Sequence, residues 1–172
     1  MKILGLPGQN QSTFHWMQEI LGTIQTENLT TSTQSYKFWD QPGSALDEAL
    51  EIGRASEFNP DLIVAKSLGT IITLLGISQG KVSPRYCVYI GIPVSSVDES
   101  VIEILSGDHA TGIVSLFIQQ SHDRTGGYSQ LCDLLPARRN FTTVEVPGED
   151  HVYSDVLELG KIINGWFGTV TE

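Results

Sequence analysis

The sequence is short of cysteine, of positive charge and of long apolar runs, and each shortage excludes a class of protein. Its two cysteines, Cys87 and Cys132, each lie in an apolar stretch with no second cysteine nearby. This spacing excludes a zinc knuckle and a redox pair, and it predicts two buried thiols. No apolar run approaches the roughly 20 residues that cross a bilayer, and the apolar residues 3–6 are too few for a signal-peptide core. We therefore expect a cytoplasmic location and no membrane partner.

Positive charge is scarce because 10 Lys and Arg residues stand against 20 Asp and Glu residues, which gives a formal net charge of -10. A surface of this sign repels phosphate groups, so nucleic acid is not expected as a partner. Hydrophobic residues make up 40% of the chain and charged residues 17%, proportions that are typical of a globular protein. The length of 172 residues predicts a single domain over residues 1–172.

Short apolar runs alternate along the chain with amphipathic stretches of helical length, a pattern typical of a parallel sheet covered by helices. The runs predict strands at residues 2–6, 35–39, 62–66, 86–91, 113–119 and 142–146. The stretches between them predict helices at residues 13–21, 45–56, 68–77, 97–105, 128–135 and 153–166, with Ser44 and Asp155 as candidate capping residues. The predicted fold is a three-layer α/β/α sandwich with a six-stranded parallel sheet in the order 2-1-3-4-5-6.

One strand-to-helix junction has the pattern of a nucleophile elbow. The predicted strand 62–66 runs directly into Ser67, and an apolar helix follows. In such an elbow the serine hydroxyl projects above the carboxyl edge of the sheet, where α/β proteins bind their ligands. Small residues two positions before and after the serine let strand and helix approach closely, and here these are Ala65 and Gly69. Ser67 is therefore the candidate nucleophile.

Backbone N–H groups near Ser67 are candidate donors to an oxyanion. The helix that starts at Leu68 offers a free N–H group at its positive end. The turn at residues 7–10, after the first strand, lies at the same edge of the predicted sheet. Because Pro7 has no N–H group, Gln9 is the second candidate donor. The alternative is that this segment is only a turn.

A serine nucleophile needs a base, and histidine is the side chain best suited to this role near neutral pH. The chain has four histidines, His15, His109, His122 and His151. The first two lie away from the ends of strands, whereas His122 and His151 follow predicted strands. An order of nucleophile, acid and base along the chain makes Asp123 the acid and His151 the base.

Two other carboxylates compete with Asp123 for the role of the acid. Asp150 adjoins His151, and neighbouring side chains in an extended loop point apart. Asp155 lies in the first turn of the predicted last helix, where a carboxylate interacts with the helix dipole. Asp123 therefore remains the preferred acid.

Three segments, residues 64–70, 121–123 and 147–151, together resemble the α/β-hydrolase superfamily. The chain is most similar to the compact members that lack a lid, including the small serine hydrolases of the retinoblastoma-binding-protein type. This resemblance implies a minimal α/β-hydrolase fold. The connection at residues 91–97, where larger members insert a cap domain, is too short to form one.

The resemblance extends to two loops that follow the first two predicted strands. Residues 7–10 resemble the loop that contributes an oxyanion donor, and residues 39–44 resemble a turn that is common in the superfamily. We therefore assign Asn10, Trp39 and Asp40 to substrate binding. For Trp39 and Asp40, a turn that shields the edge of the sheet is the alternative.

These observations predict a serine hydrolase that acts on small, soluble acyl esters in the manner of a carboxylesterase. The reaction runs through a Ser-Asp-His triad and an acyl-enzyme, with no cofactor and no metal. His122, Asp123 and His151 lack the regular spacing of a metal site. Lys66, directly before the nucleophile, is expected to reach solvent with its charged end.

Two other classes of protein remain as alternatives. One is a non-catalytic binding protein on the same fold, and the other is a flavodoxin-like or nucleotide-binding domain, whose strand order overlaps with the predicted order. Residues 6–12 contain neither a phosphate-binding loop nor a dinucleotide fingerprint, which disfavours the second. All three residue types of the triad are present in order, which favours an enzyme. The sequence predicts no oligomeric state.

Overall fold

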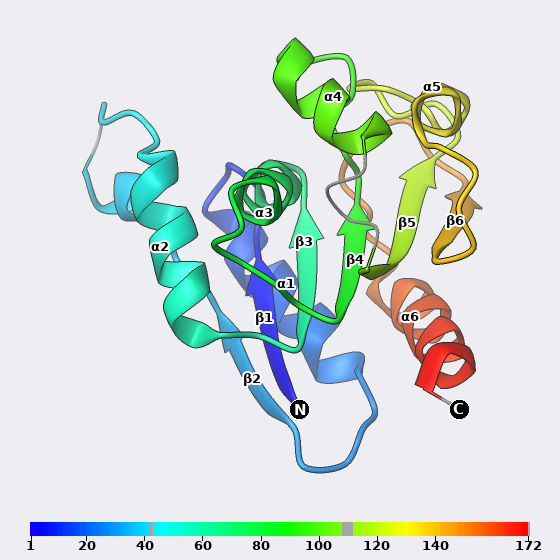
Figure 1. Cartoon of the computed structure of the whole chain (residues 1–172), viewed down its shortest axis with the longest axis horizontal. Helices are drawn as coiled ribbons and strands as arrows, with labels where there is room; N and C mark the ends of the chain where they lie inside the picture. Colours follow the sequence, from blue (N-terminus) through cyan, green and yellow to red (C-terminus); the bar gives the residue numbers. More distant parts are fainter. Residues whose placement is uncertain (42, 108–111, 172) are drawn as a thin grey trace.

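A parallel sheet of six strands forms the middle layer of the computed structural model, which describes residues 1–41, 43–107 and 112–171 (Figure 1). The strands are β1 (Lys2–Leu6), β2 (Thr30–Thr33), β3 (Leu62–Lys66), β4 (Tyr86–Ile90), β5 (Val114–Gln120) and β6 (Phe141–Val146). They lie in the order β2-β1-β3-β4-β5-β6, and every neighbouring pair is parallel. The predicted fold class and strand order are confirmed. Pro42, in the segment 39–44, and His109 lie outside the described residues.

Helices cover both faces of the sheet (Figure 1). The first face carries α2 (Glu48–Phe58), α3 (Leu68–Ser78), α4 (Glu99–Ser106) and α5 (Tyr128–Leu134), and the second carries α1 (Ser12–Thr23) and α6 (Val156–Thr171). Successive residues of β3 alternate between the two faces: Ile63 and Ala65 contact the first layer, and Leu62 and Val64 contact the second. A strand that is buried on both faces therefore has a continuous apolar sequence.

The second strand is not at its predicted position, residues 35–39. β2 covers Thr30–Thr33, and Lys37–Asp40 form a 3-10 helix. β2 lies at the edge of the sheet and pairs only with β1, so its threonines are exposed or half-buried and lack the apolar pattern of an inner strand. The aromatic segment was the stronger apolar signal, but it packs as a turn: the Tyr36 ring is fully buried and its hydroxyl donates to the Pro7 carbonyl at 2.7 Å.

The capping predictions hold for α6 and fail for α2. Asp155 caps α6, because its Oδ1 accepts a hydrogen bond from the N–H group of Glu158 at 3.0 Å. Ser44 does not cap α2, which begins three residues later than predicted. That role belongs to Asp47, whose Oδ1 accepts a hydrogen bond from the N–H group of Leu50 at 3.0 Å.

The two cysteines differ in burial. Cys87 is buried in β4, as predicted, but Cys132 is only half-buried. Cys132 belongs to α5, a helix of 7 residues that buries only Leu131, so the helix has too small an inner face to cover the thiol. None of the helices in the described part of the chain is both long and apolar enough to cross a membrane.

Candidate active site

Ser67 forms a sharp turn between β3 and α3 and has unusual backbone dihedrals, with a φ of 49° and a ψ of -112°. A positive φ is strained for a residue with a side chain, and such strain is typical of a nucleophile elbow. The N–H group of Ser67 donates to the Ile90 carbonyl at 3.1 Å, which ties the turn to β4. A Cβ at Gly69 would collide with the Leu6 carbonyl oxygen, so this position requires glycine.

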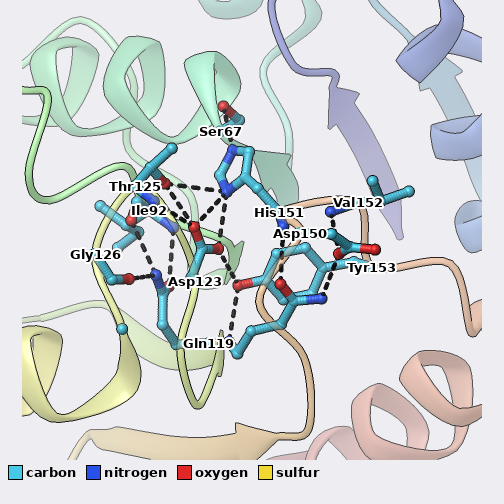
Figure 2. Close-up of polar contacts among 12 residues, drawn as sticks. Ser67, Ile92, Gln119, Asp123, Thr125, Gly126, Asp150, His151, Val152 and Tyr153 are labelled. Carbon is cyan, nitrogen blue, oxygen red and sulfur yellow. Dashed lines mark hydrogen bonds and ion pairs between the residues drawn. The ribbon is translucent and has the colours of Figure 1, made fainter.

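The three predicted catalytic side chains form a hydrogen-bonded chain at the carboxyl edge of the sheet (Figure 2). Ser67 Oγ lies 2.9 Å from His151 Nε2, and His151 Nδ1 lies 2.8 Å from Asp123 Oδ2 and 3.0 Å from Asp123 Oδ1. A proton on Nδ1 donates to the carboxylate and leaves Nε2 as the acceptor for the serine hydroxyl. This arrangement can activate the hydroxyl as a nucleophile.

Hydrogen bonds hold Asp123 in its charged form. Its side chain has no exposure to solvent, and burial by itself raises the pKa of a carboxyl group. Donors from His151, from the N–H group and hydroxyl of Thr125, and from the hydroxyl of Tyr153 outweigh burial and lower the pKa of Asp123 to about 2. The carboxylate is therefore ionised at neutral pH and stabilises a protonated His151.

Tyr153 and Gln120 support the acid and the base, and neither is identified from the sequence. The Tyr153 hydroxyl donates to Asp123 Oδ2 at 2.8 Å and accepts the N–H group of Gln120 at 2.9 Å. The Gln120 side-chain oxygen accepts the N–H group of His151 at 2.9 Å, and its nitrogen donates to Asp150 Oδ1 at 3.0 Å. No motif marks these positions. The available signals are that Gln120 ends a strand and that Tyr153 follows His151 by two residues.

The N–H groups of Leu68 and Gln9, the predicted oxyanion donors, have no protein acceptor among the described residues. Both residues line the same cavity as Ser67. The loop after β1 passes close to the nucleophile, since a Cβ at Gly8 would lie 3.5 Å from Ser67 Cβ. Thr13 Oγ1 lies 2.5 Å from the Asn10 carbonyl oxygen and 3.2 Å from the Gly8 carbonyl oxygen, so its one hydrogen is shared between the carbonyl groups on either side of Gln9 and holds this loop against α1. Both N–H groups are thus available to an oxygen atom of a ligand.

Only one of the three predicted substrate-binding residues lines this cavity. Asn10 does, whereas Trp39 and Asp40 are not among the lining residues. The Trp39 indole nitrogen donates to the Gln9 carbonyl at 2.8 Å, so this side chain supports the loop at residues 7–10. Asp40 is the last residue of the 3-10 helix. Trp39 and Asp40 therefore fit the alternative interpretation, a turn that shields the edge of the sheet.

The cavity beside Ser67 has a volume of about 860 Å³, which lies in the range usual for small-molecule sites. Its wall on the side of β1 and α1 is mainly polar and includes Gln9, Asn10, Ser12 and Thr13. Its wall along α3 is apolar, with Leu68, Ile71 and Leu75, and Val97 and Val101 also line the cavity. Polar residues from α2 and from the segment at the start of α4 line it as well, namely Glu48, Ser96, Asp98 and Ser100. The two walls therefore suit different parts of a ligand.

Lys66 is 3% exposed, so the prediction that its charged end reaches solvent is wrong. Its Nζ donates to the His151 carbonyl at 2.8 Å and lies 5.6 Å and 5.0 Å from the ring centres of Trp16 and Tyr153. The cause is the position in β3, which is covered on both faces. Burial lowers the pKa of Lys66 to about 8, against the opposing effect of nearby carboxylates.

The other candidate residues lie outside the hydrogen-bonded chain. His122 is exposed, and the exposed His15 lies 3.5 Å from Glu19 on the same helix. The carboxylate of Asp150 accepts hydrogen bonds from Gln120 and Val152 rather than from the imidazole. No group of three or more His, Cys, Asp or Glu side chains in the described parts of the chain is placed to hold a metal ion.

No family model and no curated protein matches the chain, whereas solved structures do. A hydrolase candidate of the alpha/beta superfamily from Xanthomonas campestris pv. campestris superposes with a TM-score of 0.72 at 14% identity, over 98% of each chain. MGS-MChE2, an alpha/beta hydrolase enzyme from a lagoon-sediment metagenome of Mar Chica in Morocco, superposes with a TM-score of 0.63 at 13% identity, over 100% of this chain and 92% of that one.

A third structure carries a more specific name. The esterase domain of a Rhodothermus marinus protein superposes with a TM-score of 0.62 at 13% identity, over 96% of this chain and 85% of that domain. At these identities the likeness establishes the fold alone. The chain has a minimal α/β-hydrolase fold.

Proposed function

We propose that this protein is a serine hydrolase that cleaves small, soluble carboxylic esters through an acyl-enzyme on Ser67. One observation carries the proposal: Ser67 Oγ, the His151 imidazole and the Asp123 carboxylate form a continuous hydrogen-bonded chain on a strained elbow. The free N–H groups of Leu68 and Gln9 beside this chain support it. The fold, which known hydrolases share, is consistent with it.

In the first half of the reaction Ser67 Oγ attacks the carbonyl carbon of the ester while His151 Nε2 takes the hydroxyl proton. Negative charge moves onto the carbonyl oxygen, where the N–H groups of Leu68 and Gln9 stabilise it. Asp123 stabilises the positive charge on His151. The imidazolium then gives its proton to the departing alkoxide, the C–O bond breaks, and an acyl group stays on Ser67.

In the second half a water molecule replaces the alcohol. His151 takes one proton from the water as its oxygen attacks the acyl carbon, and the same N–H groups stabilise the second oxyanion. His151 then returns the proton to Ser67 Oγ as the acyl bond breaks. The carboxylic acid leaves and the enzyme is restored.

The short connection between β4 and α4 favours monomeric esters over lipid aggregates. Residues 91–98, between β4 and α4, contain neither a helix nor a strand, so no cap domain covers the cavity from this connection. Without such a cover there is little apolar surface to enclose a long-chain lipid. We expect monomeric acyl esters to be cleaved faster than triglyceride emulsions, and no jump in rate at a lipid interface. Much faster hydrolysis of emulsions would contradict this substrate class.

The test combines a covalent probe with an ester assay. A fluorophosphonate probe should label the parent protein, and Ser67→Ala should abolish labelling and lower ester turnover by about 10⁴ to 10⁶. His151→Ala should lower turnover to a similar extent, whereas His122→Ala, which changes an exposed neighbour of the acid, serves as the matched control. Labelling that persists in Ser67→Ala would place the nucleophile elsewhere. A parent protein with neither labelling nor turnover would favour the non-catalytic binding protein.

A further inference from the structure

Beyond Ser67 the cavity continues as an apolar groove along α3. Leu68, Ile71 and Leu75 lie on one face of this helix, because residues three and four positions apart share a face. All three are half-buried, although most other residues of α3 are buried. Val97, two residues before α4, and Val101, in its first turn, line the same cavity. α3 lies between α2 and α4 on this face of the sheet (Figure 1).

The chemistry at Ser67 decides which part of an ester enters this groove. His151 must give a proton to the leaving oxygen, so the alcohol part lies beside His151. The acyl substituent of the same tetrahedral carbon points away from the leaving oxygen. The apolar wall offers such a hydrocarbon a surface to contact, whereas the polar wall with Asn10 and Thr13 offers hydrogen bonds to the alcohol part.

The length of the groove sets the length of the acyl chain. From Ser67 to Leu75 the helix advances about 12 Å, at the usual rise per residue. An extended hydrocarbon chain with ordinary C–C bonds advances about 1.3 Å per carbon, so about eight or nine carbons span this distance. Carbons beyond Leu75 leave the apolar row.

We infer that Leu68, Ile71, Leu75, Val97 and Val101 form a groove that binds the acyl chain and selects unbranched acyl groups of about eight carbons. The inference rests on the proposed function and specifies its substrate class within the monomeric esters. A fully buried methylene improves binding about fourfold, and one that is half-buried in an open groove improves it about twofold. Four methylenes thus raise kcat/KM about 15-fold between a butyrate and an octanoate ester.

The first experiment measures kcat/KM for p-nitrophenyl esters from acetate to laurate, each below its aggregation limit. The value should rise to about the octanoate and then level off or fall, because longer chains extend past Leu75. A second series keeps the acyl group as butyrate and lengthens the alkyl alcohol, with release of acid followed by titration. The alcohol series should be nearly flat.

Variants identify the groove through the ratio of octanoate to butyrate kcat/KM, which is independent of the fraction of folded protein. Leu75→Trp fills the far end of the groove and should lower the ratio from about 15 to about one or two. Ile71→Ser makes the middle of the groove polar and should lower it several-fold. Leu157→Trp is the matched control, because Leu157 is 73% exposed on α6 and lies outside the cavity.

Three outcomes would overturn the inference. A flat acyl series with Ser67-dependent hydrolysis would leave the proposed function intact and remove the groove as the acyl site. A rise in the alcohol series instead of the acyl series would assign the groove to the leaving group. A flat acyl series together with a dimer in sedimentation, abolished by Leu75→Trp, would assign the groove to a second copy of the chain.

Discussion

Replacing the buried Lys66 by methionine tests how the structure holds a charge next to the backbone of His151. Lys66→Met keeps an unbranched side chain between the rings of Trp16 and Tyr153 but removes the ammonium group and its bond to the His151 carbonyl. A lost hydrogen bond costs about 1 kcal/mol, whereas removing the buried charge relieves a burial penalty of about 3 kcal/mol. At pH 7 we therefore expect the variant to be about as stable as the parent, or slightly more stable.

The free energy of unfolding should depend on pH differently in the parent and in Lys66→Met. Lys66 loses its proton at a pKa of about 8 in the folded state and at the ordinary value of 10.5 in the unfolded chain. Between these values the unfolded state binds more protons, so the free energy of unfolding rises with pH by about 1.4 kcal/mol per pH unit. Below pH 8 both states carry the charge and the penalty is fully present. From pH 8 to pH 10 the parent should gain about 2 kcal/mol that the variant does not gain.

The assay is urea unfolding of both proteins at pH 7, 8, 9 and 10. The measured quantity is the difference between their free energies of unfolding, in which the contributions of all other groups cancel. Lys161→Met, at a side chain that is 76% exposed on α6, is the control and should show a constant difference. A difference for Lys66→Met that stays constant from pH 7 to pH 10 would refute the reasoning, because the buried ammonium would then titrate as it does in water.

Asp123→Asn should fold normally and lower turnover of esters by about 10⁴ near neutral pH, because an amide favours the wrong tautomer of the histidine, while Asp155→Asn stays within about tenfold of the parent. The reverse pattern would reassign the acid. Tyr153→Phe leaves the buried N–H group of Gln120 without its acceptor and should cost about 1–3 kcal/mol in urea unfolding. It also raises the pKa of Asp123 in the folded state. The parent loses stability on acidification between pH 3.8, the pKa of Asp123 in the unfolded chain, and about 2, its pKa in the folded state. The variant should lose less stability over this range. Thr13→Val removes the hydroxyl that holds the Asn10 and Gly8 carbonyls and should lower kcat about tenfold, with a rise in KM as well because Thr13 lines the cavity, and an unchanged kcat would exclude this positioning role.

The inner strands are predictable from the sequence, and the edge strand β2 is not. Every residue of β3 is buried, and the apolar run Leu62–Ala65 covers the strand up to its last residue, Lys66. Thr30–Thr33 has no such run, because an edge strand receives cover from one neighbour only. The stronger apolar signal at residues 35–39 comes from side chains that enter the core from a turn.

The meeting of Ser67, Asp123 and His151 is predictable because each follows a predicted strand and their order along the chain matches a known arrangement. The residues that support them are not. Lys66 and Tyr153 acquire their roles through contacts with residues far away in the sequence: Lys66 and the His151 carbonyl are 85 positions apart. Such contacts depend on how the loops are arranged above the sheet, and the local sequence around each residue does not specify that arrangement.

The polar edge strand has a consequence for the behaviour of the protein in concentrated solution. The free edge of a sheet is a template on which another chain can add a strand and start an aggregate. β2 offers only 4 residues there, all serine or threonine, with no apolar side chain to hold an added strand in place. The short length and polar sequence of β2, which make the strand hard to predict, thus also protect the sheet against edge-to-edge association.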